Sequence, residues 1–209
     1  MLKFSSELKL RTIKYFLPIF IFFQISITHA NQIEHKIAVL VNDKVITTYD
    51  IDQRMKMNAI INNIEISAEN IQFFANSVVD EIIQEKLKQE KTLEYGISVS
   101  EEEYLEYEKN FLLQKKLSKE DFKNLFKINN IKYKNFRDFV FIEISWQKVI
   151  SGLFYRLTSA SDFEVEEIIS KNPSINTEVA EDLVIQRQLD LKSSKLLRDL
   201  YNEATIEFK

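Results

Sequence analysis

Residues 36–47 read KIAVLVNDKVIT, two short runs of β-branched and other apolar residues on either side of Asn42-Asp43. Asn and Asp tolerate the backbone of a tight turn, so this stretch predicts a small β-hairpin. A second alternating stretch, ATIEF at 204–208, lies near the other end of the sequence. A strand this short must pair with another strand, and the hairpin offers the sheet edge that it needs. We therefore expect residues 31–47 and 204–209 to share one small sheet.

The sequence between these strands has helical spacing almost throughout. Apolar residues recur every three or four positions, and Ser100 with Glu103 has the pattern of a capping box at a helix start. The predicted helices cover about 48–62 and 68–94, open at Ser100 and Ser118, and cover about 132–158, 161–171 and 179–201. The fold class is therefore mostly α: a helical bundle module of about six to seven helices with a small β-sheet formed by the N-terminal hairpin and the C-terminal strand. The helix over 132–158 is apolar nearly all round, so we expect it to be central in the core.

The composition argues against most kinds of active site. The chain has no cysteine, two glycines and two histidines, His29 and His35. Thiolate zinc sites, histidine triads and glycine-rich phosphate loops therefore cannot be assembled. Asp50 with Asp52, and the run Glu101–Glu103, are best interpreted as charges in the first turns of helices. We expect no catalytic residue, metal or cofactor, and the protein is not expected to be an enzyme.

The first thirty residues have the pattern of a secretory signal peptide. Basic residues are followed by an apolar run from Tyr15 to Ile27, and Thr28-His29-Ala30 offers a cleavage site after Ala30. The apolar run falls short of the roughly 20 residues that span a bilayer as a helix, so an uncleaved anchor in the inner membrane is the alternative. Without residues 1–30 the chain has 24 basic and 31 acidic residues, a net charge of −7. Nucleic acid normally demands a stripe of Lys and Arg, and we expect no cluster of that kind in this acidic part, so nucleic-acid binding is not expected.

Three stretches resemble the SurA family of bacterial envelope chaperones. IAVLVNDKVIT at 37–47, followed by YDIDQR at 49–54, is similar to the opening of these proteins. VDEIIQEKL at 79–87, with GISVS at 96–100, is similar to a helix and link of the same family. EDL to ATIEF at 181–208 resembles the family's C-terminal helix and strand.

The resemblance implies one chaperone core over 31–209, in which an N-terminal helical module, 31–172, is closed by a C-terminal helix and strand, 178–209. In the family, prolyl-isomerase domains of the parvulin type usually stand between these two parts. Only a short loop separates them here, so the isomerase domains are expected to be absent.

The resemblance also implies a function. A SurA-like chaperone is expected to act in the periplasm as an ATP-independent holdase, which binds unfolded outer-membrane β-barrel proteins and assists their folding or assembly. The outer-membrane assembly machinery is a possible further partner, and no small-molecule substrate is expected. A non-catalytic adaptor or structural subunit of an envelope assembly complex is the alternative, and a degenerate prolyl isomerase is a third hypothesis.

A holdase requires apolar side chains that a client can reach. Methionine repacks easily and aromatic rings suit the aromatic-rich strands of β-barrel clients. The candidate client-binding residues are Met55, Met57, Phe73, Tyr104, Phe111, Phe122, Phe126, Tyr133 and Tyr155.

Overall fold

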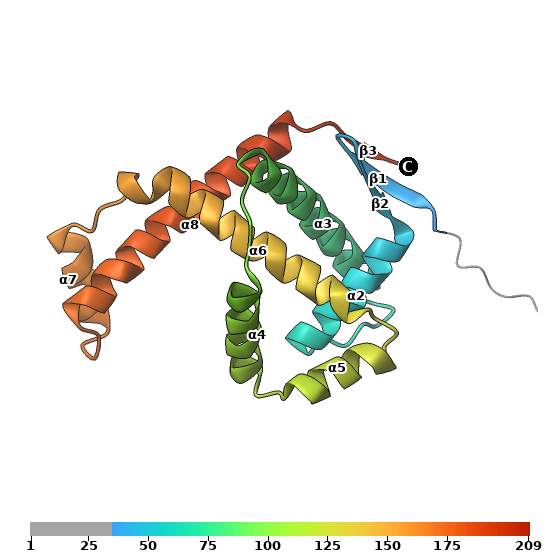
Figure 1. Cartoon of the computed structure of the whole chain (residues 1–209), viewed down its shortest axis with the longest axis horizontal. Helices are drawn as coiled ribbons and strands as arrows, with labels where there is room; N and C mark the ends of the chain where they lie inside the picture. The colour runs from blue at the N-terminus through green and yellow to red at the C-terminus, as the bar shows by residue number, and fades with distance from the viewer. Residues whose placement is uncertain (1–34) are drawn as a thin grey trace, which may run out of the picture. The chain divides into compact units, whose positions relative to one another are not determined.

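The computed structural model describes residues 35–209, which form one compact unit (Figure 1). Within the described residues, seven α-helices follow a β-hairpin, and a third strand follows the last helix. The elements are β1 (Ile37–Val41), β2 (Lys44–Thr47), α2 (Thr48–Asn62), α3 (Ile71–Glu94), α4 (Glu101–Lys115), α5 (Lys119–Ile128), α6 (Tyr133–Phe154), the 3₁₀ helix η1 (Tyr155–Leu157), α7 (Asp162–Lys171), α8 (Thr177–Glu203) and β3 (Ile206–Phe208). The predicted fold class is confirmed.

The three strands form one antiparallel sheet in the order β2-β1-β3 (Figure 1). Asn42 has a φ of 52° in the hairpin turn, a conformation that asparagine tolerates better than most residues. The same Asn42 joins the turn to β3: its N–H donates to the Thr205 carbonyl at 2.8 Å, and its side-chain oxygen accepts from the Thr205 N–H at 3.0 Å. The expected pairing between the hairpin and the C-terminal strand is therefore confirmed.

Side-chain caps fix where most of the helices begin. Thr47 with Asp50, Ser100 with Glu103 and Ser161 with Glu164 form capping boxes at the starts of α2, α4 and α7. These pairs satisfy backbone N–H groups that have no partner within the helix. Ser118 caps α5 by accepting from the Asp121 N–H. The helix starts predicted at Ser100, Ser118 and Ser161 are confirmed.

Other helix ends differ from the prediction because polar side chains redirect the backbone. The Asn70 side chain accepts a hydrogen bond from the Ser67 N–H and donates one to the Glu65 carbonyl. These bonds hold residues 67–70 in a turn, so α3 begins at Ile71 and not near residue 68 as predicted. α6 ends at Phe154 and tightens into η1, where the Thr158 hydroxyl donates to the Tyr155 carbonyl at 2.7 Å. α8 begins two residues earlier than expected because Asn176 caps it.

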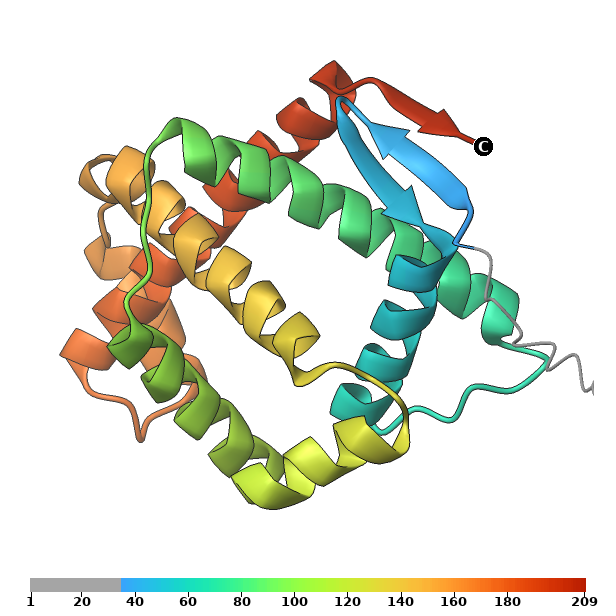
Figure 2. The same cartoon turned by 45° about the vertical axis from the view of Figure 1, so that its right-hand side comes forward.

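α6 connects the two parts of the core. It lies between α3 and α4 (Figure 2). Its first half contributes Phe136, Val140 and Ile144 to a cluster shared with α2, α4 and α5. Its second half packs Trp146 and neighbouring residues against α8, as expected for a central helix. A third cluster joins the sheet to α3 and the end of α8.

The predicted signal peptide, residues 1–30, lies outside the described residues. The boundaries 31–172 and 178–209 remain predictions, although residues 35–209 behave as one unit. None of the helices within 35–209 combines the length and the apolar character that crossing a membrane requires.

Candidate client-binding surfaces

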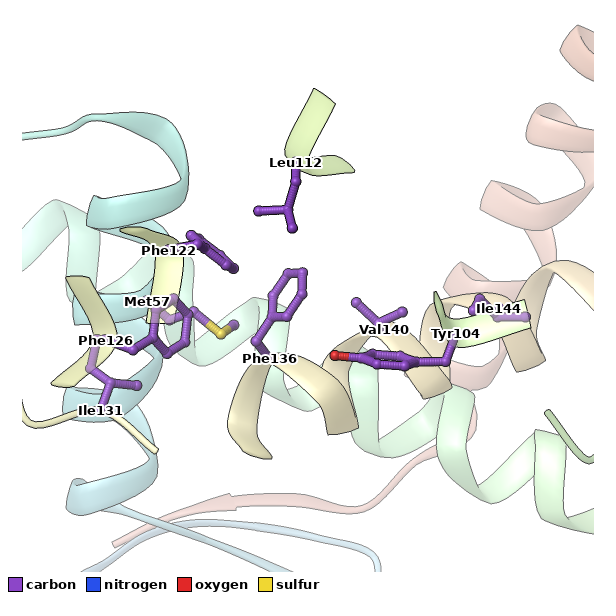
Figure 3. Close-up of a cluster of buried hydrophobic side chains, with 9 residues drawn as sticks. All are labelled: Met57, Tyr104, Leu112, Phe122, Phe126, Ile131, Phe136, Val140 and Ile144. Carbon is purple, nitrogen blue, oxygen red and sulfur yellow. The ribbon is translucent and has the colours of Figure 1, made fainter. Parts of the chain in front are cut away.

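An interlocked group of aromatic rings fills the space between α4, α5 and α6 (Figure 3). Phe136 lies at its centre, with ring centroids 5.1 Å from Phe111, 5.0 Å from Phe122 and 5.9 Å from Tyr133. Met57 reaches the same cluster from α2. Edge-to-face and tilted rings at these separations are a favourable arrangement. We call these side chains, together with Tyr104 and Phe126, the aromatic core.

The aromatic core contains most of the residues that the sequence suggested for client binding. Met57, Tyr104, Phe122 and Phe126 are buried, each at most 3% exposed. Their three rings and one thioether fill the space between helices, so these four side chains form no accessible surface in the folded protein. Client binding by them remains untested.

The other five candidates differ in exposure. Phe111 and Tyr133 are half-buried at the edge of the aromatic core. Met55 is half-buried against the cluster beneath the sheet. Phe73 is 81% exposed and Tyr155 is 57% exposed. Only these last two lie fully at the surface, as a client-binding role requires.

Phe73 lies at the start of α3, after the loop that leaves α2. Ile64 and Ile71 from the same region are also exposed. An open hollow of about 400 Å³ lies between this loop, α2 and α5. It is lined by Lys56, Ala59, Ile60, Asn63, Ile64, Ile66, Leu125 and Asn129. We call this region the α2–α3 corner.

A larger group of exposed apolar side chains belongs to residues 155–191, which we call the C-terminal arm. The arm comprises η1, α7 and the first half of α8, and α7 lies beside α8 (Figure 1). The two helices pack through the buried side chains of Val165, Ala180 and Val184. The exposed large apolar residues of the arm are Tyr155, Leu157, Phe163, Val179, Leu183 and Leu191. Groups of exposed apolar residues of this kind mark interaction surfaces when they are contiguous.

The buried carboxylate of Glu108 links α4, α5 and α6 through hydrogen bonds beside the aromatic core. It accepts hydrogen bonds from the Tyr104 hydroxyl at 2.6 Å and the Tyr133 hydroxyl at 2.7 Å. Lys119 donates to its other oxygen. The four residues come from α4, α5 and α6, so the network joins all three helices.

The protonation of this network follows from its geometry. Burial of Glu108 acts to raise its pKa, but the hydrogen bonds from Lys119, Tyr104 and Tyr133 outweigh burial and hold the pKa of Glu108 below its ordinary value. Burial and the neighbouring carboxylate raise the pKa of Tyr104 and of Tyr133. Glu108 therefore stays ionised and both tyrosines remain donors at neutral pH. The sequence carried a signal for this network, because Glu108 is one helical turn after Tyr104 on the inward face of α4.

A polar pocket between α2, α3 and α6 contains groups that satisfy one another. Arg54 pairs with Glu85, and the buried Gln53 donates to the Asn130 carbonyl and accepts from Asn135. Within residues 35–209, every buried side-chain polar atom has a hydrogen-bond partner. No group of three or more metal-ligating residues is found in this part of the chain.

Comparison with known proteins assigns the family. Residues 7–150 match the SurA-like N-terminal domain family. The match spans more than half of the chain, and the chain therefore belongs to this family. Family membership supports a general chaperone role. Residues 35–209 contain no parvulin-type domain, since the helical module and its sheet account for all of their secondary structure.

One of several solved structures that match the chain illustrates the similarity. It comes from work on the virulence factor PEB4 and the periplasmic protein Cj1289 of Campylobacter jejuni, described as two structurally related SurA-like chaperones. The sequence identity is 27% and the TM-score is 0.37. The match covers 66% of this chain and 50% of the other, so the chain spans about half the length of that relative. No curated protein matches the chain.

Proposed function

We propose that the protein is an ATP-independent periplasmic holdase that binds unfolded outer-membrane β-barrel proteins and assists their folding or assembly. In this proposal residues 1–30 direct export and are removed after Ala30. The family supports a chaperone role, and the exposed apolar residues of the C-terminal arm supply a surface for clients. The exposure of these six side chains on one arm of the protein is the observation on which the proposal chiefly rests.

The chemistry of the arm suits extended apolar clients. Phe163 is 77% exposed and Leu191 is 66% exposed, so a client can cover most of each side chain. Burying one such side chain contributes about 1.5–3 kcal/mol. Two or three of these contacts are sufficient for the weak, reversible binding that a holdase needs. Phe73, at the α2–α3 corner, is a second contact point in this proposal.

The test is suppression of aggregation of an outer-membrane β-barrel protein that is diluted from urea. Residues 31–209 are suitable because they include the whole described unit. We expect the parent to suppress aggregation and the double variant Phe163→Ser/Leu191→Ser to need at least about a hundredfold more protein for half-suppression. The variant Phe73→Ser measures the contribution of the α2–α3 corner separately.

A matched control removes two exposed leucines elsewhere, in Leu93→Ser/Leu105→Ser. This control is expected to suppress aggregation as well as the parent does. Equal loss in both double variants would remove the arm as the client surface. A well-folded parent that suppresses no aggregation would overturn the holdase proposal and favour an adaptor with one folded partner.

We also propose that the protein has no prolyl-isomerase activity. The buried side-chain polar groups of residues 35–209 all have hydrogen-bond partners within the fold. The isomerase domains of the family are not present within residues 35–209. In an assay with a proline-containing peptide, the rate is expected to equal the slow uncatalysed rate. Acceleration that increases with protein concentration would contradict this expectation.

A further inference from the structure

The end of α4, all of α5 and the start of α6 carry an unusual concentration of positive charge. Residues 109–134 contain eight lysines and two acidic residues, a net charge of +6. The whole chain has a net charge of −4, so the remaining residues together carry −10. We call this segment the lysine-rich corner. Its charge is opposite to that of the rest of the protein.

Most of these lysines are not neutralised by the protein itself. Lys119 pairs with Glu108, and Lys134 pairs with Asp138. The other six are exposed and form no ion pair within residues 35–209. These six are Lys109, Lys115, Lys116, Lys123, Lys127 and Lys132. Lys115, Lys123 and Lys132 lie over the rings of Phe111, Tyr133 and Tyr49. No carboxylate within residues 35–209 neutralises any of the six, so an external anion can pair with them.

α5 places three of the lysines on one flank. Lys119, Lys123 and Lys127 are four residues apart, so they follow one flank of α5. The adjacent, inward face of α5 carries Phe122 and Phe126, which pack in the aromatic core. The acidic residues of the segment, Glu120 and Asp121, are confined to the first turn of α5. Positive charge therefore predominates from the middle of α5 to the start of α6.

Exposed aliphatic side chains accompany the lysines. Ile128 directly follows Lys127 at the end of α5 and is 76% exposed. Leu113 lies two residues before Lys115 near the end of α4 and is also exposed. Lysines combined with exposed aliphatic side chains are typical of segments that bind at the surface of an anionic bilayer, where the charges contact headgroups and the aliphatic groups enter the boundary with the acyl chains.

The residue types favour a lipid surface over other anions. Residues 109–134 contain no arginine, whereas arginine is enriched and lysine depleted in protein–protein interfaces. The buried Phe122 and Phe126 are not available to stack on bases, as single-stranded nucleic acid requires. We propose that the lysine-rich corner docks the protein on a membrane surface that carries anionic phospholipid headgroups. This proposal is independent of the holdase proposal.

The test is co-sedimentation of residues 31–209 with lipid vesicles. One vesicle preparation contains phosphatidylcholine alone, and the other contains about 30% phosphatidylglycerol. We expect binding only to the anionic vesicles, and we expect it to be lost when the salt concentration is raised from about 0.05 M to about 0.5 M. The variant Ile128→Ser is expected to weaken binding about tenfold through loss of its apolar contact.

Two triple variants distinguish the contribution of the lysine-rich corner from that of the overall net charge. Lys116→Gln/Lys123→Gln/Lys127→Gln should weaken binding about a hundredfold, since each lysine near an anionic surface contributes about fivefold. Lys171→Gln/Lys195→Gln/Lys209→Gln removes the same charge from α7, α8 and the residue after β3. This control should stay within about threefold of the parent. Circular dichroism establishes that both variants are folded.

Three outcomes would overturn the proposal. The first is a folded parent that does not sediment with anionic vesicles. The second is an equal loss of binding in the two triple variants, because net charge rather than the corner would then explain the binding. The third is tighter binding to polyglutamate than to anionic vesicles, because the occupant would then be an acidic polypeptide.

Discussion

Replacement of Phe136 with alanine is expected to lower the free energy of unfolding by about 3–5 kcal/mol. The Phe136 side chain is fully buried, and its ring lies within about 6 Å of the rings of Phe111, Phe122 and Tyr133. α4, α5 and α6 all contribute to this packing, so the three helices cannot close over the cavity without moving together. A loss of this size is a large part of the 5–15 kcal/mol by which domains are usually stable.

The measurement is urea unfolding followed by circular dichroism. The matched control is Phe163→Ala, which makes the same chemical change at a side chain that is 77% exposed. This control is expected to change the free energy of unfolding by less than about 0.5 kcal/mol. Similar losses in the two variants would show that the aromatic core is not the main source of stability in this half of the protein.

The second large effect is expected at Glu108. Glu108→Ala leaves the hydroxyls of Tyr104 and Tyr133 without their acceptor and leaves Lys119 without its ion pair. Removing one member of a buried charged network costs about 3–5 kcal/mol, and the partial exposure of Lys119 places the expected loss near about 3 kcal/mol. Glu106→Ala, an exposed position on the same helix, should have an effect below about 0.5 kcal/mol.

The pH dependence of this effect has a definite sign. The ordinary pKa of a Glu carboxyl is 4.5, and the pKa of Glu108 in the folded protein is lower. The ionised carboxylate therefore stabilises the folded state fully above pH 4.5, and this stabilisation is lost as the pH falls through the lowered pKa. The variant Glu108→Gln has no titratable carboxyl at this position. The difference in unfolding free energy between the parent and Glu108→Gln should shrink between about pH 7 and about pH 3, and a constant difference would contradict the assignment.

Local chemistry made much of the fold predictable. Asn42-Asp43 marked the hairpin turn, and Ser100 and Ser161 marked helix starts, because each of these features depends on a few neighbouring residues. The pairing of β3 with β1 was predictable for a different reason, since a short strand required an edge. The start of α3 was missed because Asn70 uses its side chain in the preceding turn.

The candidate surfaces were much less predictable. Aromatic residues at helical spacing have the same pattern whether they enter a core or face a client, so Phe122 and Phe126 could not be distinguished from Phe73. The positive charge of the lysine-rich corner is present in residues 109–134 of the sequence, but the sequence does not show which lysines of α4, α5 and α6 remain exposed without an ion pair. Only the packing of these helices reveals which flank each lysine occupies. The network of Glu108 required the same tertiary information, because its partners come from three helices.

The pairing of β1 with β3 also constrains when the protein can fold. Asn42 and Thr205 are 163 residues apart, so a ribosome that has just made the hairpin must add nearly all of the helices before the sheet can be completed. α8 and β3 also pack against the cluster beneath the sheet, and that cluster stays partly open until they emerge. Contacts between such distant residues form late because closing a long loop costs conformational entropy. The nascent chain therefore lacks its finished sheet during nearly all of its synthesis.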